Sequence, residues 1–400
     1  MTVTEQTAAG WHQDLGRGAV GAALARVTAA RLAGLPPRAA LPWIRGMTAA
    51  PVAASMSASL FYGAPAVAFV LHTGDHPAYA PMLAALDKSI NDLTRLKLAA
   101  AYERMRRGQL TQPSEYDLIS GLTGLGLYHL ARHGPAASGM TGAVLEYLVA
   151  LAQPVRQQGV PLPGWWSGTG PSGTPDPAWP GGHLNLGMAH GIAGVLALLS
   201  GAMRSGIHVE GHAETITALC AIFDRYRQGT SERPWWPPTI TLSEYRQGPA
   251  GAERQARPSW CYGTPGHARA QQLAGLAMGD RERMRTAEHA LAGCVLDPQA
   301  VGLLTDASLC HGWAGIVQAL RRAAADALDP QPVQAALRTA EHGMEDHLTR
   351  MGPPASGGFL EGTSGIQLAQ DDLPHQGSEP PAWDACLLLA ATRTTDNERR

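Results

Sequence analysis

The sequence lacks a strong charge of either sign. Its 400 residues include 31 Lys and Arg and 33 Asp and Glu, which gives a formal net charge of −2. Proteins that hold a nucleic acid backbone usually carry a large basic field. The charge balance therefore argues against nucleic acid as a partner.

The chain also lacks an obvious targeting segment. Its first residues, MTVTEQTAAGWHQDLGRG, have neither the basic start nor the apolar run of a signal peptide. The longest stretch without charge, residues 46–74, contains prolines, serines and glycines that favour a buried core segment over a membrane span. We therefore expect a cytoplasmic protein.

Cysteine is scarce, with five residues in the whole chain. In a reducing compartment, metal binding or catalysis explains cysteines better than disulfides do. Cys220, Cys294 and Cys386 lie inside apolar helical runs, so we expect them to be ordinary core residues. Cys261 and Cys310 have a different setting, next to glycine turns.

Glycine and proline are abundant, with 46 and 30 residues, which indicates many turns. A short unit, G-x-x-G or G-x-P-A/G, opens an apolar segment again and again along the chain. The units begin near residues 61, 119, 188, 261, 309 and 360, roughly 50 to 75 residues apart. Such spacing is typical of a helix-pair repeat.

The apolar residues after each unit follow a helical period, and a second helical pattern lies between units. Examples of the second pattern are residues 77–96, 212–227 and 283–296. Helix pairs of this kind can build an open solenoid or a closed ring of inner and outer helices. In a closed ring the glycine units would start the inner helices, all on one rim. We expect an N-terminal helix over residues 24–41.

Two stretches, residues 161–186 and 229–258, break the helical pattern and are rich in Gly, Pro and Trp. We interpret them as loop insertions within one domain that spans residues 1–400, and we expect them to form a small β element. The pairs Trp165–Trp166 and Trp235–Trp236 are candidates for a peptide-contacting face; packing over the helices is the alternative.

The most specific group of candidate metal ligands consists of Cys261, Cys310 and His311. Two thiolates and one imidazole suit zinc, and three protein ligands leave a fourth position free for water or substrate. Neighbours on a regular helix point about 100° apart. Cys310 and His311 can therefore reach one ion only from a turn before the helix, where Gly312 places them.

These residues and their surrounding motifs are similar to those of a known protein family. The sequence resembles the lanthionine synthetase C-like proteins, in particular the stand-alone lanthipeptide cyclases of class I pathways. The resemblance rests on WCYGTPG at 260–266, CHGWAG at 310–315 and AHGIAG at 189–194, supported by YDLISGLTGLG at 116–126 and EGTSG at 361–365. It extends from about residue 57 to residue 383.

The resemblance implies an all-α fold, an α/α toroid of about seven inner and seven outer helices around one catalytic zinc. The zinc ligands of the family correspond to Cys261, Cys310 and His311, the same residues for which the pattern of cysteines and histidine predicts a zinc site. The further active-site positions fall on His190, Asp117, Arg257 and Tyr262. We expect His129, His183 and His267, which also lie near the units, at the rim or the surface.

The implied reaction is ring closure in a ribosomally made peptide. A substrate cysteine thiol adds to dehydroalanine or dehydrobutyrine and forms lanthionine or methyllanthionine. The implied partners are a dehydrated precursor with leader and core, a separate dehydratase and an export transporter; attachment to a membrane through such a complex is an open alternative.

Each candidate residue suits a step of that reaction. His190 could protonate the α-carbon, Asp117 could orient His190, and Arg257 could stabilise the enolate. Each also has a structural alternative: Asp117 could cap a helix, Tyr262 could serve packing, Arg257 could be a surface loop residue, and His190 could be structural.

Three other activities compete. Relatives of the family add glutathione to dehydrated residues with the same zinc. A scaffold with a structural zinc would only present the peptide, but structural zinc usually has four protein ligands. A glycoside-processing barrel would need two neighbouring carboxylates, where the units offer Cys and His.

Overall fold

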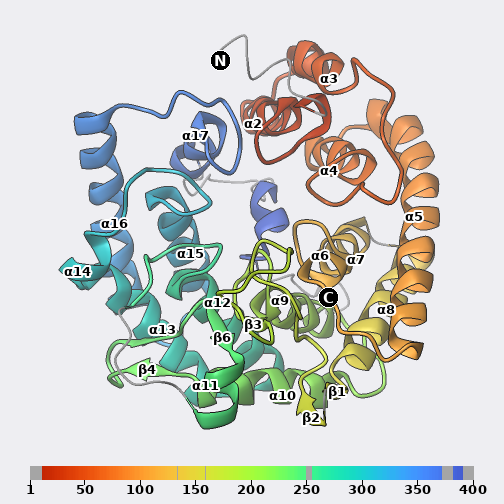
Figure 1. The fold of residues 1–400 in the computed structure, drawn as a ribbon. Coiled ribbons are helices and arrows are strands. Elements are labelled where there is room, and N and C mark those ends of the chain that lie inside the picture. The colour runs from red at the N-terminus through yellow and green to blue at the C-terminus, as the bar shows by residue number, and fades with distance from the viewer. Residues whose placement is uncertain (1–10, 133, 158, 249–254, 372–381, 391–400) are drawn as a thin grey trace, which may run out of the picture.

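The computed structural model describes residues 11–132, 134–157, 159–248, 255–371 and 382–390. Its helices form two concentric rings (Figure 1). Within the described residues the inner ring consists of α2 (Ala19–Leu32), α4 (Ala64–Gly74), α7 (Leu122–Arg132), α9 (Ile192–Arg204), α12 (Thr264–Met278), α15 (Trp313–Asp326) and α17 (Thr363–Asp371). Each of these helices packs against the next, and α17 packs against α2. The ring is therefore closed, which excludes the open solenoid.

The outer ring covers the inner one. In the described part of the chain it consists of α3 (Leu41–Met47), α5 (Ala80–Arg106), α8 (Pro135–Leu151), α10 (His212–Arg225), α13 (Arg281–Leu296) and α16 (Pro330–Met351). These are six helices among the described residues, where about seven were expected. Each packs against the inner helix that precedes it along the chain.

The two rings differ in how their residues are buried. In α9 every residue from Ile192 to Ala202 is buried, because the helix is covered on all sides. In α16 only one face is buried, by Val333, Ala336, Ala340 and Met344. This spacing of three and four residues is that of an amphipathic helix on a curved core.

Short elements connect the rings. The short helices are η1 (Trp11–Gln13), η2 (Pro37–Ala40), η3 (Pro77–Tyr79), α6 (Pro113–Tyr116), α11 (Leu242–Gln247), α14 (Pro298–Val301) and η4 (Trp383–Leu387). The strands form antiparallel pairs: β1 (Val155–Gln157) with β2 (Val160–Leu162), β3 (His183–Asn185) with β6 (Thr239–Thr241), and β4 (Gln228–Gly229) with β5 (Pro234–Trp235). The pair β3–β6 joins the two predicted loop insertions, with Leu184 opposite Ile240, which confirms a small β element.

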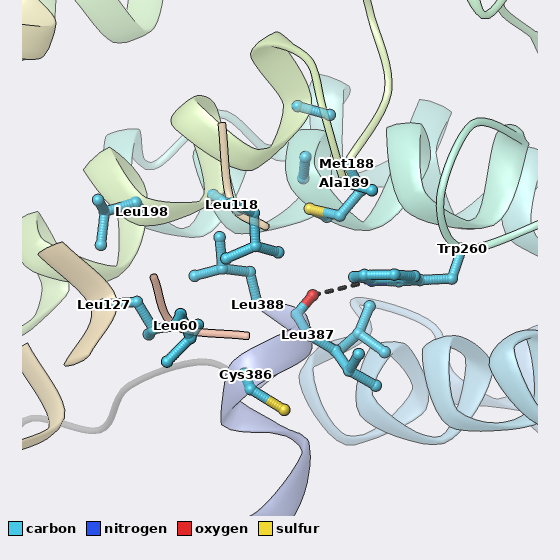
Figure 2. Packing of buried hydrophobic residues seen from close by; sticks show 14 of the residues in the cluster. Leu60, Leu118, Leu127, Met188, Ala189, Leu198, Trp260, Cys386, Leu387 and Leu388 are labelled. Carbon is cyan, nitrogen blue, oxygen red and sulfur yellow. Dashed lines mark hydrogen bonds between the residues drawn. The ribbon is translucent and has the colours of Figure 1, made fainter. Parts of the chain in front are cut away.

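The centre of the inner ring is filled by the segment around η4 (Figure 2). Leu387 and Leu388 are buried there among residues of several inner-ring units, such as Leu118 and Met188. The indole Nε1 of Trp260 donates a hydrogen bond to the carbonyl oxygen of Leu387 at 2.9 Å. Residues 382–390, which we call the plug, thus fill the ring.

A belt of backbone hydrogen bonds runs along one rim and links neighbouring repeat units. Each bond joins the residues just before the glycines of two units. The bonds are Leu15 N to Phe61 O at 2.9 Å, Leu118 N to Ala189 O at 3.2 Å, Ala189 N to Cys261 O at 3.2 Å, Cys261 N to Cys310 O at 3.2 Å, Cys310 N to Leu360 O at 2.9 Å and Leu360 N to Gly16 O at 2.8 Å. Residues far apart in sequence are therefore neighbours on this rim.

The glycines of the repeat unit are required by close packing. A Cβ at Gly312 would overlap the carbonyl oxygen of Asp306, and one at Gly315 would overlap the carbonyl oxygen of Leu309. Gly312 has a φ of −115°, which any residue can adopt. Close approach of the helix start to its own preceding turn, and not an unusual backbone angle, therefore explains this glycine.

The belt reveals a repeat unit that the sequence analysis missed. Gly16 and Leu15 take part in the belt, and α2 follows them as an inner helix. The pattern Gly18-x-x-Gly21 before an apolar helix is the signal that could have found it. The helix expected over residues 24–41 was misplaced for the same reason: α2 begins at Ala19 and ends at Leu32, before Pro36 and Pro37.

Two further expectations need correction. The uncharged stretch 46–74 is buried in its second half, where α4 lies, whereas residues 49–57 are mostly exposed or partly exposed. Three tryptophans of the proposed peptide-contacting face, Trp165, Trp166 and Trp236, are buried, which favours the packing alternative; Trp235 is half-buried. A buried indole needs a hydrogen-bond partner, and Trp236 Nε1 finds one in the carbonyl oxygen of Phe223 in α10, at 2.9 Å.

No helix in the described ranges combines the length and the apolar character that crossing a membrane requires.

Candidate active site

Cys261 and Cys310 are brought together by the belt. Each precedes the first glycine of its unit, and the direct backbone bond between them makes them neighbours on the rim. One ligand atom each from Cys261, Cys310 and His311 lies within 4.8 Å of the others. This is the group predicted from the sequence, and its two sulfurs and one imidazole suit a metal of intermediate softness.

A hydrogen bond between the two thiols shifts their pKa values in opposite directions. The hydrogen bond from Cys310 lowers the pKa of Cys261 well below its usual range, against the effect of burial. The same bond, together with burial, raises the pKa of Cys310. A metal ion that binds both sulfurs must displace the proton of this hydrogen bond.

Asp306 holds His311 in place. Nε2 of the imidazole lies 3.2 Å from Oδ2 of Asp306. The hydrogen bond to Asp306, followed by one to Cys261, raises the pKa of His311 to about 9. Metal binding therefore also requires this imidazole to lose a proton. The sequence analysis missed Asp306, which lies in an irregular loop before the unit.

A second group, His190 with Asp117, lies beside the sulfurs on the same rim. The backbone N–H of Ala189 bonds Cys261 O and that of Leu118 bonds Ala189 O, so these two units follow Cys261 around the belt. Nδ1 of His190 lies 2.6 Å from Oδ2 of Asp117. The structure thus brings the predicted His190–Asp117 pair together.

Asp117 also caps its own turn, as the structural alternative proposed. Its Oδ1 accepts hydrogen bonds from the backbone N–H groups of Ser120 at 2.6 Å and Gly121 at 2.9 Å. One oxygen therefore holds the turn while the other holds His190. The carboxyl group is 1% exposed, so it cannot rotate away without losing buried hydrogen bonds.

The partners of His190 favour its charged form. Burial lowers the pKa of His190, but the hydrogen bond to Asp117 and its negative charge outweigh burial, and the pKa is raised above its usual value. Because Nδ1 is engaged, Nε2 is the nitrogen that can exchange a proton. The ring stacks on Tyr262, with centroids 6.0 Å apart and an angle of 27° between the planes.

Tyr262 stays a neutral phenol at ordinary pH, because burial raises its pKa to about 12. Arg257 lies at the edge of the site, where its Nη1 donates to Thr305 Oγ1 at 3.4 Å. Its charge acts on the ionisation of Cys310 and lowers the pKa of that thiol, although other effects raise it. Both predicted residues are therefore near the sulfurs.

The next unit around the belt adds an ion pair to the mouth of the site. Arg17 donates to Glu361 Oε1 at 3.0 Å, and the charges of both side chains act on Cys310. Neither residue was singled out as a site residue from the sequence. Their position could have been found by extending the repeat to the unit at Gly16.

His129, His183 and His267 are not at the surface, which corrects the expectation for them. Each is at most 2% exposed. Burial lowers the pKa of His129 to about 4 and that of His267 to about 3, so both are neutral core residues. Cys220, Cys294 and Cys386 are buried, as predicted.

Comparison with known proteins finds similarity to lanthionine synthetase C-like proteins in both sequence and fold. The family model described as "Lanthionine synthetase C-like protein" matches residues 11–388. The nisin biosynthesis protein NisC of Lactococcus lactis subsp. lactis is 25% identical over 337 residues, which cover 84% of this chain and 78% of that protein.

Among solved structures, nisin cyclase matches with a TM-score of 0.79 at 21% identity, covering 96% of this chain and 94% of the other. This likeness supports the toroid. An unsaturated glucuronyl hydrolase from Bacillus sp. GL1 reaches a TM-score of 0.43 at 16% identity over 96% of each chain, too low to carry an argument.

Proposed function

Because the chain belongs to the lanthionine synthetase C-like family, we propose that it is a zinc-dependent cyclase that forms thioether rings in a dehydrated peptide. The observation that carries the proposal is the placement of Cys261, Cys310 and His311 beside the His190–Asp117 pair on one rim. The similarity to the nisin biosynthesis protein supports a lanthipeptide precursor as the substrate.

Cys261, Cys310 and His311 would hold the zinc. Two thiolates and a neutral imidazole leave the ion formally uncharged and one position open, so bound zinc would keep the substrate thiol deprotonated and nucleophilic. The buried setting of Cys261 keeps competing water away from its sulfur. The belt bond to Cys310 fixes the spacing of the two sulfurs.

The chain supplies the remaining proton and charge. When the sulfur adds to the β-carbon of a dehydrated residue, the π electrons move onto the neighbouring amide oxygen. Arg257, whose positive charge lies at the edge of the site, would stabilise that oxygen. His190, whose charged form Asp117 favours, then gives a proton from Nε2 to the α-carbon, and the proton that the substrate thiol has lost restores the charged histidine.

The roles of the remaining residues follow from their contacts. Asp117 holds Nδ1 of His190 and thereby the orientation of Nε2. Tyr262 forms the wall on which His190 stacks. The separate dehydratase and the export transporter remain predictions from the family resemblance. The cytoplasmic location remains a prediction from the sequence.

Removal and return of the metal tests this function. Protein freed of metal with a chelator should leave the thiols of a dehydrated, cysteine-containing peptide untouched, and added Zn²⁺ should restore their loss. Thiols are counted with an alkylating probe, since ring closure leaves the peptide mass unchanged. A mass increase by one glutathione, in the presence of glutathione, would favour the adduct-forming activity. Zinc-bound protein that consumes thiols in neither assay would favour a scaffold.

A further inference from the structure

Asp306 lies in the loop between α14 and α15, five residues before His311. Its two carboxylate oxygens have separate partners. Oδ2 lies 3.2 Å from Nε2 of His311, and Oδ1 accepts from the backbone N–H of Ser308 at 2.8 Å. The carbonyl oxygen of Asp306 accepts from the N–H of Trp313 at 3.3 Å. The residue therefore ties the turn that carries Cys310 and His311 to the start of α15.

This arrangement decides which nitrogen of His311 can bind a metal. An imidazole has two ring nitrogens, and a carboxylate at one of them holds the proton there. With Nε2 engaged by Asp306, the lone pair of a neutral His311 is left on Nδ1. One ligand atom of the His311 ring lies within 4.8 Å of the sulfurs of Cys261 and Cys310, so the ring is within reach of both Asp306 and the sulfurs.

We propose that Asp306 is a positioning residue, the carboxylate that fixes the tautomer and the ring orientation of His311 as a metal ligand. The proposal rests on the zinc site proposed above. Carboxylates in this position are common partners of metal-bound histidines, and their loss typically weakens metal binding about 10- to 100-fold.

The contact differs from an ordinary surface ion pair. The side chains of His311 and Asp306 are 25% and 31% exposed, whereas those of Arg95 and Asp92 are 63% and 61% exposed. The bond to Ser308 and the tight approach of Gly312 also hold the carboxylate at a fixed distance from the ring. An asparagine could keep the bond to Ser308 through its Oδ1, but its amide would present a donor to Nε2.

The test uses Asp306→Asn in the full chain, with Asp297→Asn as a matched control. Asp297 makes the same local bond, from its Oδ1 to the N–H of Gln299 at 2.9 Å, at the start of α14. Zinc affinity is measured by competition with a coloured chelator, and the ligand field is measured from the visible spectrum of the Co²⁺-loaded protein. We expect zinc binding weakened about 10- to 100-fold and an altered Co²⁺ spectrum for Asp306→Asn, with no change for Asp297→Asn.

A second variant guards against misfolding. Asp306→Ser is short, so it can cap Ser308 but cannot reach His311; it should weaken zinc binding in the same way. Wild-type zinc affinity and an unchanged Co²⁺ spectrum in either folded variant would overturn the proposal. A wild-type protein that binds no zinc would overturn both this proposal and the metal site. Weakened zinc binding in a protein that consumes no peptide thiols would support the role of Asp306 and count against the cyclase.

Discussion

At the scale of single residues, the most informative group is the carboxyl of Asp117. It is 1% exposed, and its two oxygens bind different partners, the turn at Gly121 and the ring of His190. The structural and the catalytic interpretations of this residue are therefore compatible. The buried negative charge of Asp117 keeps His190 protonated at a pH at which an equally buried histidine without such a partner would be neutral.

Asp117→Asn should change the pH dependence of ring closure. Because the pKa of His190 is raised, its protonated form persists above the pH at which an ordinary histidine becomes neutral. The protonated form is lost as the pH rises through the raised pKa. Asparagine keeps the cap but removes the charge, so burial becomes the largest effect on His190 and its pKa falls. Above both pKa values the rate should drop about tenfold for each pKa unit lost.

The measurement is the rate of peptide thiol loss from pH 5.5 to pH 9. The ratio of variant to wild type cancels the titration of the substrate thiol itself. We expect a ratio that falls as pH rises. A ratio that is constant with pH would mean that His190 is not the acid.

Not every residue of the site could be read from the sequence, and the reason is spatial. The pattern predicts that four site residues converge, because each lies one or two residues before the first glycine of its repeat unit: Cys261, Cys310, His190 and His311. Asp306 is outside the repeat unit, in a loop whose path depends on packing. The sequence alone therefore gave no reason to pair it with His311.

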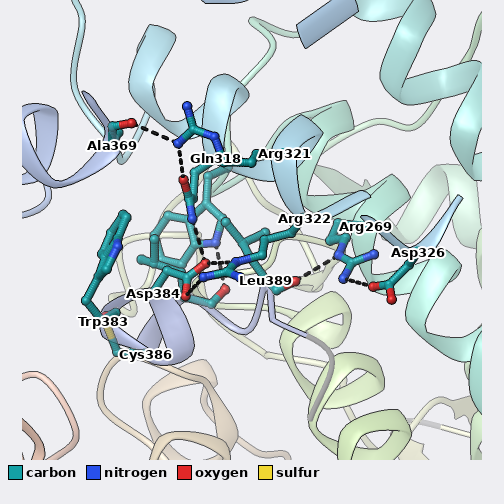
Figure 3. Close-up of polar contacts among 12 residues, drawn as sticks. Arg269, Gln318, Arg321, Arg322, Asp326, Ala369, Trp383, Asp384, Cys386 and Leu389 are labelled. Carbon is teal, nitrogen blue, oxygen red and sulfur yellow. Dashed lines mark hydrogen bonds and ion pairs between the residues drawn. The ribbon is translucent and has the colours of Figure 1, made fainter. Parts of the chain in front are cut away.

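At the scale of elements, the plug around η4 fills the centre of the ring and is held there by polar contacts (Figure 3). Asp384 is fully buried and binds Nε and Nη2 of Arg322, at 2.5 and 2.8 Å. It also accepts from Gln318 Nε2 at 2.7 Å. Arg269 donates from Nε to the carbonyl oxygen of Leu389 at 2.8 Å. Polar contacts from α12 and α15 thus fasten the plug at both ends.

The plug was not predicted, because its residues form no repeat unit and no long helix. Cys386 was expected in a helical core run and is indeed buried. Nothing in the local pattern indicates that the run lies in the centre of the ring. Only the tertiary contacts of Trp260 and Arg322 place it there.

Asp384→Ala should destabilise the protein by about 2–4 kcal/mol, because it leaves a partly buried guanidinium without this carboxylate. The side chain of Arg322 is 23% exposed, which places the effect below that of a fully buried pair. The free energy of unfolding is measured by urea denaturation. Asp92→Ala, which breaks an exposed pair with Arg95, should change it by less than about 0.5 kcal/mol. An equal effect of both variants would mean that the plug does not brace the ring.

At the scale of the whole molecule, closure of the ring brings residues of different repeat units together at one site. Neighbouring units are joined by bonds of the rim belt, so residues from different units meet although they are far apart in sequence. Arg17 and Glu361, for example, are 344 residues apart and form a hydrogen bond. The repeat predicted the helix pairs and the rim. The burial of the tryptophans in the two loop insertions depends on tertiary contacts that a periodic pattern does not encode.

The central claim is that one zinc, held by Cys261, Cys310 and His311, carries ring closure. The most direct measurement takes zinc per chain and loss of peptide thiols on the same preparations of wild type, Cys310→Ala and Cys220→Ala. Cys220 is a buried cysteine in α10, outside the candidate site, and serves as the control. The account predicts one zinc and thiol loss for wild type and Cys220→Ala, and the loss of both for Cys310→Ala. A folded Cys310→Ala protein that still closes rings at the wild-type rate would contradict it.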